Sequence, residues 1–358
     1  MSKRHYIIPI FVPHEGCPHN CVFCNQNSIT GNETVVVDES YAEEVIQSHL
    51  RTINKEDSII EISFFGGTFT AIHIDKQKRL LRVAKKYKDS GEINYIRLST
   101  RPDYVDHNIL NNLKSYDVDI IELGVQSMDN EVLRYSGRGH TEEDVVNAVT
   151  LIKEYGFTLG IQIMLGLPKD NFSKDIETVK KVIDLKPNLC RIYPALVVKN
   201  TPMEIMYEKG GYIPYTLEEA VTISKVVFGM LSANGVNVIR IGLQPTEEIN
   251  YGKEIVIGPF HPAFRELVQS SIINDMIYEF LIGKTISSIN ISINPKTTSK
   301  LFANKKQYFK DMLNKLNLST IRVSGDSNLQ QDELKVLLNG TEYNLSIATY
   351  IWRKYKEG

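Results

Sequence analysis

The strongest constraint on the fold is a regular alternation of short apolar runs with longer amphipathic stretches over about the first 245 residues. Each run has the continuous apolar character of a strand that is buried on both faces. Strands that alternate with helical patterns every 30–40 residues or so belong to parallel sheets with right-handed crossovers. The predicted strands are 6–12, 59–65, 95–99, 119–123, 158–164 and 188–193, and 236–241 is a candidate seventh.

This alternation predicts an α/β fold, a partial (β/α)6 barrel of the TIM type, because a closed barrel would need eight strands. Polar or glycine residues follow each predicted strand, and each of them taken alone is typical of a turn. The carboxyl ends of barrel strands meet at one edge, where barrel enzymes carry their chemistry. The sequence therefore predicts a site at that edge, formed from Gly66-Gly67-Thr68, Ser99, Gln126, Gln162 and Met164.

Three of the four cysteines lie close together directly after the first predicted strand. Cys17, Cys21 and Cys24 have the spacing C-x3-C-x2-C, and the fourth cysteine is distant in the sequence. A structural zinc site takes four protein ligands. A cubane [4Fe–4S] cluster held by three cysteines would keep one iron open for a ligand that is not protein. The motif therefore favours an iron–sulfur cluster.

Two other interpretations of these cysteines remain open at this point. His14 or His19 could complete a Cys3His zinc site in a protein that is not an enzyme. A disulfide with one spare thiol is less compatible with a chain that otherwise has no secreted character. Cys190 lies inside a predicted strand, which is typical of a small buried apolar side chain.

Composition narrows the class of protein further. The chain has 358 residues, of which 42% are hydrophobic and 23% charged, and its net charge is −2. This balance is that of a globular protein without an overall basic surface for nucleic acid. The first apolar run is interrupted by Pro9, and no apolar stretch approaches the roughly 18 residues of a membrane span. We expect a cytoplasmic protein.

Six ordered motifs make residues 1–245 resemble a radical SAM core, and in particular the radical SAM half of the catalytic subunit of Elongator and its bacterial relatives. A weaker resemblance, to oxygen-independent coproporphyrinogen oxidase, covers Gln126 and Arg138. The motifs are Phe65-Gly66-Gly67-Thr68-Phe69-Thr70, Ser99-Thr100-Arg101-Pro102-Asp103, Glu122-Leu123-Gly124-Val125-Gln126-Ser127, Gly137-Arg138-Gly139-His140-Thr141, Met164-Leu165-Gly166-Leu167-Pro168 and Arg191-Ile192-Tyr193-Pro194-Ala195-Leu196-Val197-Val198.

The resemblance implies a role for each of these positions. Cys17, Cys21 and Cys24 would ligate a [4Fe–4S] cluster, and the open iron would bind S-adenosylmethionine. The other implied contacts to this cofactor are Phe23 beside the adenine, Gly66, Gly67 and Thr68 at the methionine moiety, Ser99 as a polar contact, Gln126 and Arg138 at the ribose and carboxylate, and Gln162 and Met164 as the lining of the floor.

The implied chemistry is reductive cleavage of S-adenosylmethionine to a 5′-deoxyadenosyl radical. A one-electron reductant such as a flavodoxin or ferredoxin would be a partner, and the radical would abstract hydrogen from an unactivated carbon. RNA, most plausibly tRNA, is the implied substrate. A small molecule or a peptide is the alternative.

Residues 246–284 are expected to link the core to a small C-terminal unit, with an ordered loop across the barrel mouth. His261 and Arg265 in this segment could face substrate, although a turn with satisfied polar caps is the simpler interpretation. The remaining 285–358 leave no room for the acetyltransferase-like domain of Elongator, so use of acetyl-CoA is in doubt.

The element order in 285–358 resembles a small α+β fold of the KH type. The loop at 303–306 occupies the place of the KH backbone clamp, yet Ala303 and Lys306 replace its two glycines. Lysine side chains around this loop could contact RNA phosphates instead. The candidates are Lys300, Lys305, Lys306 and Lys310. A structural module with solvated lysines is the alternative.

Overall fold

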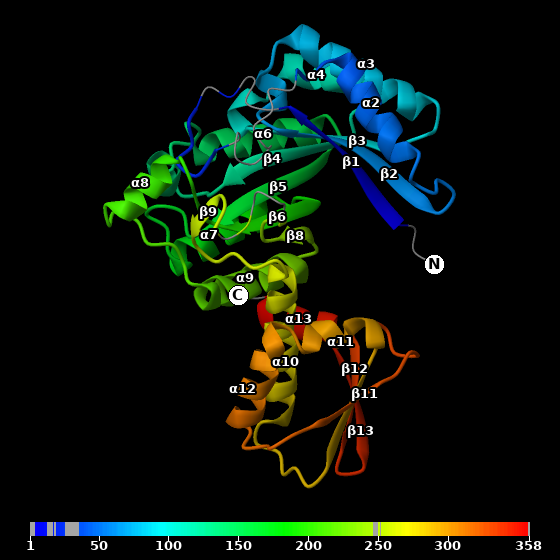
Figure 1. The fold of residues 1–358 in the computed structure, drawn as a ribbon, viewed down its shortest axis with the longest axis vertical. Coiled ribbons are helices and arrows are strands. Elements are labelled where there is room, and N and C mark those ends of the chain that lie inside the picture. Colours follow the sequence, from blue (N-terminus) through cyan, green and yellow to red (C-terminus); the bar gives the residue numbers. More distant parts are fainter. Residues whose placement is uncertain are drawn as a thin grey trace.

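The computed structural model describes residues 4–12, 17, 19–25, 36–245, 250 and 252–356, and seven parallel strands of this part form one curled sheet (Figure 1). The strand order is β1-β2-β3-β4-β5-β6-β8, so the strands of this sheet follow one another in chain order. The predicted partial barrel is confirmed, and the candidate seventh strand completes it. The strands are β1 (Arg4–Val12), β2 (Ser58–Gly66), β3 (Tyr95–Thr100), β4 (Ile120–Gln126), β5 (Thr158–Leu165), β6 (Leu189–Pro194) and β8 (Asn237–Ile241).

Helices cover the outer face of this sheet and begin where side chains cap their first turns. Asp38, Thr141 and Thr216 each accept a hydrogen bond from a backbone N–H of the helix that follows. Helices therefore begin directly after Asp38, Thr141 and Thr216. The helices of the barrel are α2 (Glu39–Leu50), α3 (Ile74–Asp89), α4 (His107–Ser115), α5 (Asn130–Tyr135), α6 (Glu142–Glu154), α7 (Phe172–Asp184), α8 (Pro202–Glu208) and α9 (Leu217–Ala233).

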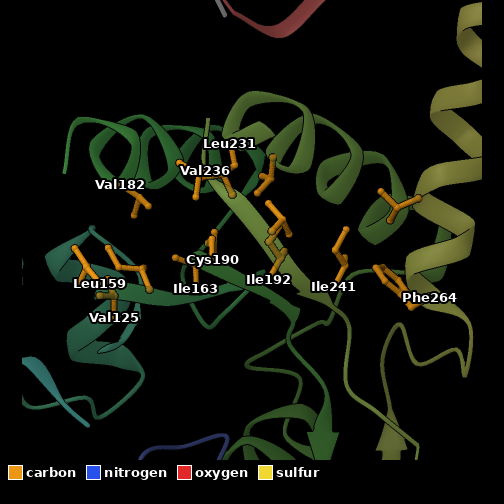
Figure 2. Close-up of a cluster of buried hydrophobic side chains, with 14 of the residues drawn as sticks. Val125, Leu159, Ile163, Val182, Cys190, Ile192, Leu231, Val236, Ile241 and Phe264 are labelled. Atoms are coloured by element: carbon orange, nitrogen blue, oxygen red, sulfur yellow. The ribbon is translucent and has the colours of Figure 1, made fainter. Parts of the chain in front are cut away.

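The hydrophobic core lies between the sheet and these helices. Figure 2 shows Val182 of α7 and Leu231 of α9 on the helix side, and Leu159, Ile163, Cys190 and Ile192 on the sheet. All six side chains have no exposed area. The prediction that Cys190 is a buried apolar side chain is confirmed, and its burial raises the pKa of the thiol.

The chain after β6 contains elements that the sequence analysis did not predict. Short strand β7 (Val197–Val198) pairs antiparallel with β9 (Ile255–Ile257), and α8 and α9 lie between them in the sequence. The long helix α10 (Phe264–Leu281) then runs from the barrel toward the C-terminal part (Figure 1). Arg265 donates to the main-chain oxygens of Val238 and Ile239, so it fastens α10 to β8 rather than facing substrate. His261 accepts a hydrogen bond from the Ala263 N–H. This contact agrees with the simpler interpretation of the segment as a turn with satisfied polar caps.

The C-terminal part is an α+β unit, as predicted. Its sheet has the strand order β11-β10-β12-β13, in which β10 and β11 are parallel and the other neighbours antiparallel. Strands β12 and β13 form a hairpin, whose turn has Asn339 at φ 51° and Gly340 at φ 83°. The resemblance to a KH fold stays a prediction. The elements are β10 (Ile289–Ile293), α11 (Thr298–Leu301), α12 (Gln307–Lys315), β11 (Arg322–Gly325), β12 (Glu333–Leu338), β13 (Thr341–Ser346) and α13 (Ile347–Tyr355).

This unit packs on the outside of the barrel through α13. A Cβ added at Gly229 of α9 would lie 2.4 Å from the Tyr355 ring, so the glycine allows the ring to lie directly on the helix. Tyr350 of α13 donates to Glu279 of α10 at 3.0 Å. No helix in the described ranges has the length and apolar character needed to cross a membrane.

Candidate active site

The concave face of the sheet carries a ring of partly accessible residues near the carboxyl ends of the strands. Residues that face the helices are buried, and their sequence neighbours point to the opposite, concave face. Ser99, Gln162 and Met164, all predicted for the site, are half-buried on this face, whereas most other residues of their strands are buried. We call the set the inner ring, and its members are Phe11, Phe65, Ser99, Gly124, Gln162, Met164 and Tyr193.

Below the inner ring, charged side chains form a buried floor that the sequence analysis did not predict. Arg97 on β3 donates to Glu61 on β2 at 3.0 Å and to Glu122 on β4 at 3.1 Å. Glu122 also lies 2.5 Å from Arg191 of β6. Gly160 of β5 leaves the space that Glu122 needs, because a Cβ there would lie 3.0 Å from the Glu122 side chain. Opposite charges alternate across the barrel, so each charge is compensated after burial.

The described part of the cysteine loop lies across the carboxyl edge and is held from two sides. The Val22 N–H donates to the Ser136 main-chain oxygen at 3.0 Å, and the Val22 oxygen accepts from the Met203 N–H at 2.9 Å. The Asn25 side chain donates to the Lys199 oxygen at 2.9 Å. These contacts join the loop to the segments that follow β4 and β6. The loop is therefore fixed to the far side of the barrel from its own strand, β1.

Two glycines around the predicted Arg138 make room for the cysteine loop. Gly139 has φ 75°, and a Cβ at this position would overlap the His19 ring at 2.3 Å. A Cβ at Gly137 would lie 3.1 Å from the Asn20 oxygen. His19 itself lies 4.0 Å from the Asp103 carboxylate, which gives its ring a carboxylate neighbour. His14, the other histidine of the zinc interpretation, lies outside the described residues.

Two buried arginines lie beside the thiols. Arg138 Nη1 donates to Cys21 Sγ at 3.2 Å, and Arg101 donates to Asp103 and to the Arg138 main-chain oxygen. Arg138 Nε and Arg101 Nη1 are buried and have no hydrogen-bond partner among the described residues. Burial and the two guanidinium charges lower the pKa of neighbouring His140 to about 3, so its ring is neutral. Asp103 compensates the charge of Arg101, whereas Arg138 has no carboxylate partner among the described residues. The unmet donors and the charge of Arg138 suit an anionic ligand.

The fit of this site to a cluster rests on its donor chemistry. Cys17, Cys21 and Cys24 are not joined by a disulfide bond. Within the described ranges, no three histidine, cysteine or carboxylate side chains are gathered in a metal-binding arrangement. Three thiols on one loop, with buried N–H donors beside them, fit an anionic thiolate-bound cluster.

The loop after β2 and the end of β4 show the backbone conformations that the motifs require. Gly66 has φ 109°, and a Cβ there would lie 2.7 Å from the Val12 oxygen. The Gly67 N–H donates to the same oxygen at 2.9 Å, so this loop lies against the end of β1. Gln126 is buried at a positive φ of 70° and accepts from Gln162 at 3.3 Å. A non-glycine residue held in this conformation is a feature of functional sites.

The structure brings together Phe23 and Met164, two of the residues predicted to bind the cofactor. Both pack on a small apolar cluster formed by Val132, Leu167 and Ala195 at the carboxyl edge. Thr68, which follows the two glycines in the sequence, is buried. The predicted cofactor residues thus lie along one edge of the sheet, from β2 to β6.

A pair of carboxyl groups, of which Asp175 is buried and Asp170 is half-buried, supports the turn after β5, and the sequence analysis missed it. Asp175 accepts from the Gly166 N–H at 3.3 Å and from the Tyr215 hydroxyl at 2.9 Å, and it is hydrogen-bonded to Asp170. Tyr212 donates to the Gly166 oxygen at 2.6 Å. Burial raises the pKa of Asp170 to about 6, and burial together with the Asp170 charge raises the pKa of Asp175 to about 9. The pair therefore keeps a proton at neutral pH.

The predicted lysines of the C-terminal unit do not form a single group. Lys305, Lys306 and Lys310 are exposed, and no ion pair joins them to a carboxylate in the described part of the chain. Lys300 instead lines a cavity of about 380 Å³ between α9, α10 and the C-terminal unit. The backbone of the α11–α12 turn is left-handed at three successive residues that are not glycine. Their φ angles are 52° at Asn304, 52° at Lys305 and 68° at Lys306.

The comparisons with known proteins agree with this geometry. The family model of the Radical SAM superfamily matches residues 11–182, and that of the Radical_SAM C-terminal domain matches residues 187–274. The chain belongs to the radical SAM superfamily. It is a radical SAM enzyme, and the cofactors of this superfamily are a [4Fe–4S] cluster and S-adenosylmethionine.

Several of the relatives belong to the Elongator branch of the superfamily. The tRNA uridine(34) acetyltransferase of Methanocaldococcus jannaschii is 30% identical over 255 residues, which are 61% of this chain and 47% of that protein. Human Elongator complex protein 3 is 27% identical over 184 residues, which are 46% of this chain and 34% of that protein. The chain thus spans half or less of the length of these relatives.

Among solved structures, the Elp3 protein of Methanocaldococcus infernus without residues 1–46 has the same fold. The TM-score is 0.62 at 24% identity, and the match covers 77% of this chain and 64% of that one. The predicted resemblance to the Elongator branch is therefore confirmed for the fold of the radical SAM core.

Proposed function

We propose that this radical SAM enzyme modifies a base of tRNA. The observation that carries the proposal is the 30% identity to a tRNA uridine(34) acetyltransferase along the barrel. The exposed lysines of the α11–α12 turn support it, because they offer side-chain contacts to phosphates without a basic surface overall. The match covers less than half of that relative, so the proposal includes the radical step and does not include acetyl transfer.

In this proposal Cys17, Cys21 and Cys24 hold the cluster, and Arg138 compensates the negative charge of its thiolates. When bound, the reduced cluster supplies the electron that cleaves S-adenosylmethionine to a 5′-deoxyadenosyl radical. The chain's own residues bind and orient the cofactor. We assign the methionine moiety to Gly66, Gly67 and Thr68, the ribose and carboxylate to Gln126 and Arg138, the adenine to Phe23, and the remaining contacts to Ser99, Gln162 and Met164.

The partners and the location belong to the same proposal. A flavodoxin or a ferredoxin would supply the electron, because the cluster has a low potential. Such a cluster and cysteines without disulfides favour a reducing compartment, so we propose the cytoplasm.

The chemistry is tested by removing single cysteines from the anaerobically reconstituted protein. We expect Cys24→Ala to lose most of its iron and to form no 5′-deoxyadenosine with dithionite and S-adenosylmethionine. Cys190→Ala is the matched control, because this cysteine is buried in the core away from the loop, and it should keep both properties. Equal iron and equal 5′-deoxyadenosine in the Cys24→Ala protein would overturn the assignment of the cluster ligands.

RNA binding is tested through its dependence on salt. Each lysine–phosphate contact adds roughly 0.7–0.9 to the slope of log affinity against log salt concentration. The double substitution Lys305→Ala and Lys306→Ala should therefore lower the slope for an unmodified tRNA transcript by about 1.4–1.8. Lys153→Ala with Lys180→Ala, two exposed lysines of the outer helices α6 and α7, is the control and should leave the slope unchanged. An unchanged slope in both proteins would show that the turn does not hold RNA.

A further inference from the structure

The inner ring contains flat side chains from opposite sides of the barrel. Phe11 of β1 and Phe65 of β2 are register partners, and their ring centroids lie 6.3 Å apart at an interplanar angle of 46°. The Arg191 guanidinium reaches from β6 to within 5.4 Å of the Phe65 centroid. The Tyr193 hydroxyl lies 3.4 Å from Arg191 Nη1. Three aromatic rings and one planar cation thus meet on the concave face.

Phe11 keeps an unusual amount of open surface for a position inside a barrel. It is 38% exposed, although the neighbouring Ile10 and Val12 are buried against the helices. The interior of a closed TIM barrel is filled with packed branched side chains. An open aromatic surface beside the Gly66-Gly67 loop is therefore surface that a ligand can cover.

The charges on this surface are paired, which makes it unsuited to a phosphate group. Arg191 is 8% exposed and its charge is compensated by Glu122 at 2.5 Å, so it is not placed to hold a phosphate. Its planar guanidinium can still stack, as it does on Phe65. Flat, nearly neutral surfaces with polar neighbours such as Ser99 and Gln162 suit a planar heterocycle with hydrogen-bonding edges.

We propose that Phe11, Phe65 and Arg191 form a stacking platform that receives one nucleobase of the RNA substrate. This inference rests on the proposed function. An enzyme that acts on a base in a folded nucleic acid takes the base out of its stack, and a protein surface must replace the lost stacking. Adenine of S-adenosylmethionine could stack by the same chemistry. Phe23, which we assign to the adenine, packs instead on Val132, Leu167 and Ala195 toward the β4–β6 side.

A tryptophan reporter separates these two sources of a heterocycle. The chain has a single tryptophan, Trp352 in α13, and Trp352→Phe removes its signal. In this background, Phe11→Trp places an indole on the platform. Tyr95→Trp is the matched control, because Tyr95 is 41% exposed and lies in register with Glu61 at the opposite end of the concave face. The full-length reconstituted proteins are titrated with an unmodified tRNA transcript and, separately, with S-adenosylmethionine.

We expect the transcript to quench the Phe11→Trp fluorescence by at least a third and to saturate, with less than a tenth of that response for Tyr95→Trp or for S-adenosylmethionine alone. Quenching by S-adenosylmethionine and not by the transcript would overturn the proposal in favour of the cofactor's adenine. A transcript that is retained on a filter without quenching would overturn the platform and leave tRNA as the substrate. A transcript that is not retained would overturn both proposals.

A measurement on the wild-type protein covers the case in which Phe11→Trp does not fold. A transcript that contains 4-thiouridine is crosslinked by light, and the attached peptides are identified by mass spectrometry. We expect crosslinked peptides that include Phe11, Phe65 or Tyr193. Crosslinks confined to the C-terminal unit and the outer helices would overturn the platform.

Discussion

Four charged side chains in the floor of the barrel each contact a side chain of opposite charge, whereas three exposed lysines around the α11–α12 turn have no carboxylate partner among the described residues. Of these three, Lys306 lies over the Phe302 ring at 4.8 Å from its centroid. The floor residues are buried, so an uncompensated charge there would cost several kcal/mol. The turn lysines are solvated, so their charge costs little and stays available to a ligand. The comparison teaches that compensated charge in this chain builds the scaffold and that uncompensated charge marks surfaces for binding.

The largest expected effect comes from breaking the floor. Arg97→Met removes the guanidinium between Glu61 and Glu122 and leaves both carboxylates buried without it. We expect the free energy of unfolding to fall by about 3–5 kcal/mol, measured by urea denaturation at pH 7. Arg82→Met, at an exposed arginine of α3, is the control and should change it by less than about 0.5 kcal/mol. Equal effects of the two substitutions would mean that the floor does not stabilise the barrel.

The Asp170–Asp175 pair extends this comparison of compensated with uncompensated charge. In this pair a retained proton, and not a side chain of opposite charge, neutralises a carboxylate. The pKa of both carboxyls is raised in the folded protein, to about 6 and about 9, from roughly 3.9 when unfolded. The stabilising contribution is therefore complete below about pH 4 and is lost as the pH rises toward 9. One extra proton in the folded state lowers the stability by up to about 1.4 kcal/mol per pH unit.

Asp175→Asn should remove most of the dependence of the unfolding free energy on pH, because the amide resembles the protonated acid. We expect a flatter curve of unfolding free energy from pH 6 to pH 9 than in the wild type, measured by urea denaturation at each pH. Asp184→Asn changes an exposed carboxylate at the other end of α7 and should keep the wild-type slope. Identical slopes in all three proteins would contradict proton sharing by the pair.

The smallest expected effect concerns the left-handed turn. Lys306 has φ 68° and ψ 20°, a conformation that costs a side chain about 1 kcal/mol and that glycine adopts without this cost. Lys306→Gly should therefore raise the free energy of unfolding by roughly 0.5–1 kcal/mol and at the same time weaken retention of tRNA. Lys310→Gly, inside α12, should instead lower stability by about 1 kcal/mol. A loss of stability for both would show that the turn is not strained.

The sequence predicted the strands well, because buried parallel strands appear as continuous apolar runs. It missed the floor for a related reason. Glu61, Arg97 and Glu122 lie inside runs that are otherwise apolar, and a single charge in such a run does not reveal that its partners come from strands more than 20 residues away. Only the register of the sheet brings these charges together.

The helices between β6 and β8 were missed although their first residues carry start signals, since Thr201 and Thr216 are each followed three residues later by a glutamate. Helix α9 is apolar on most sides, since it packs between the sheet and α13, so it lacks a clear polar face. Asp170 and Asp175 looked like ordinary residues at the start of a helix. The tyrosines that enclose this pair lie about 40 residues later in the sequence, so its burial was not predictable. The site motifs were found because they occupy successive strand ends.

The anchors of the cysteine loop also have a consequence for the order in which this enzyme can mature. The loop leaves the ribosome before the segments that anchor it, because Asn25 bonds to a residue 174 positions later and Val22 bonds to Met203. The thiols therefore gain their final surroundings only after β6 and the start of α8 have been synthesised and folded. We expect a chain that ends at residue 186 to contain all three cysteines and yet to take up little iron. Cluster insertion would then follow the folding of the barrel. A bound cluster would therefore indicate that the barrel is complete.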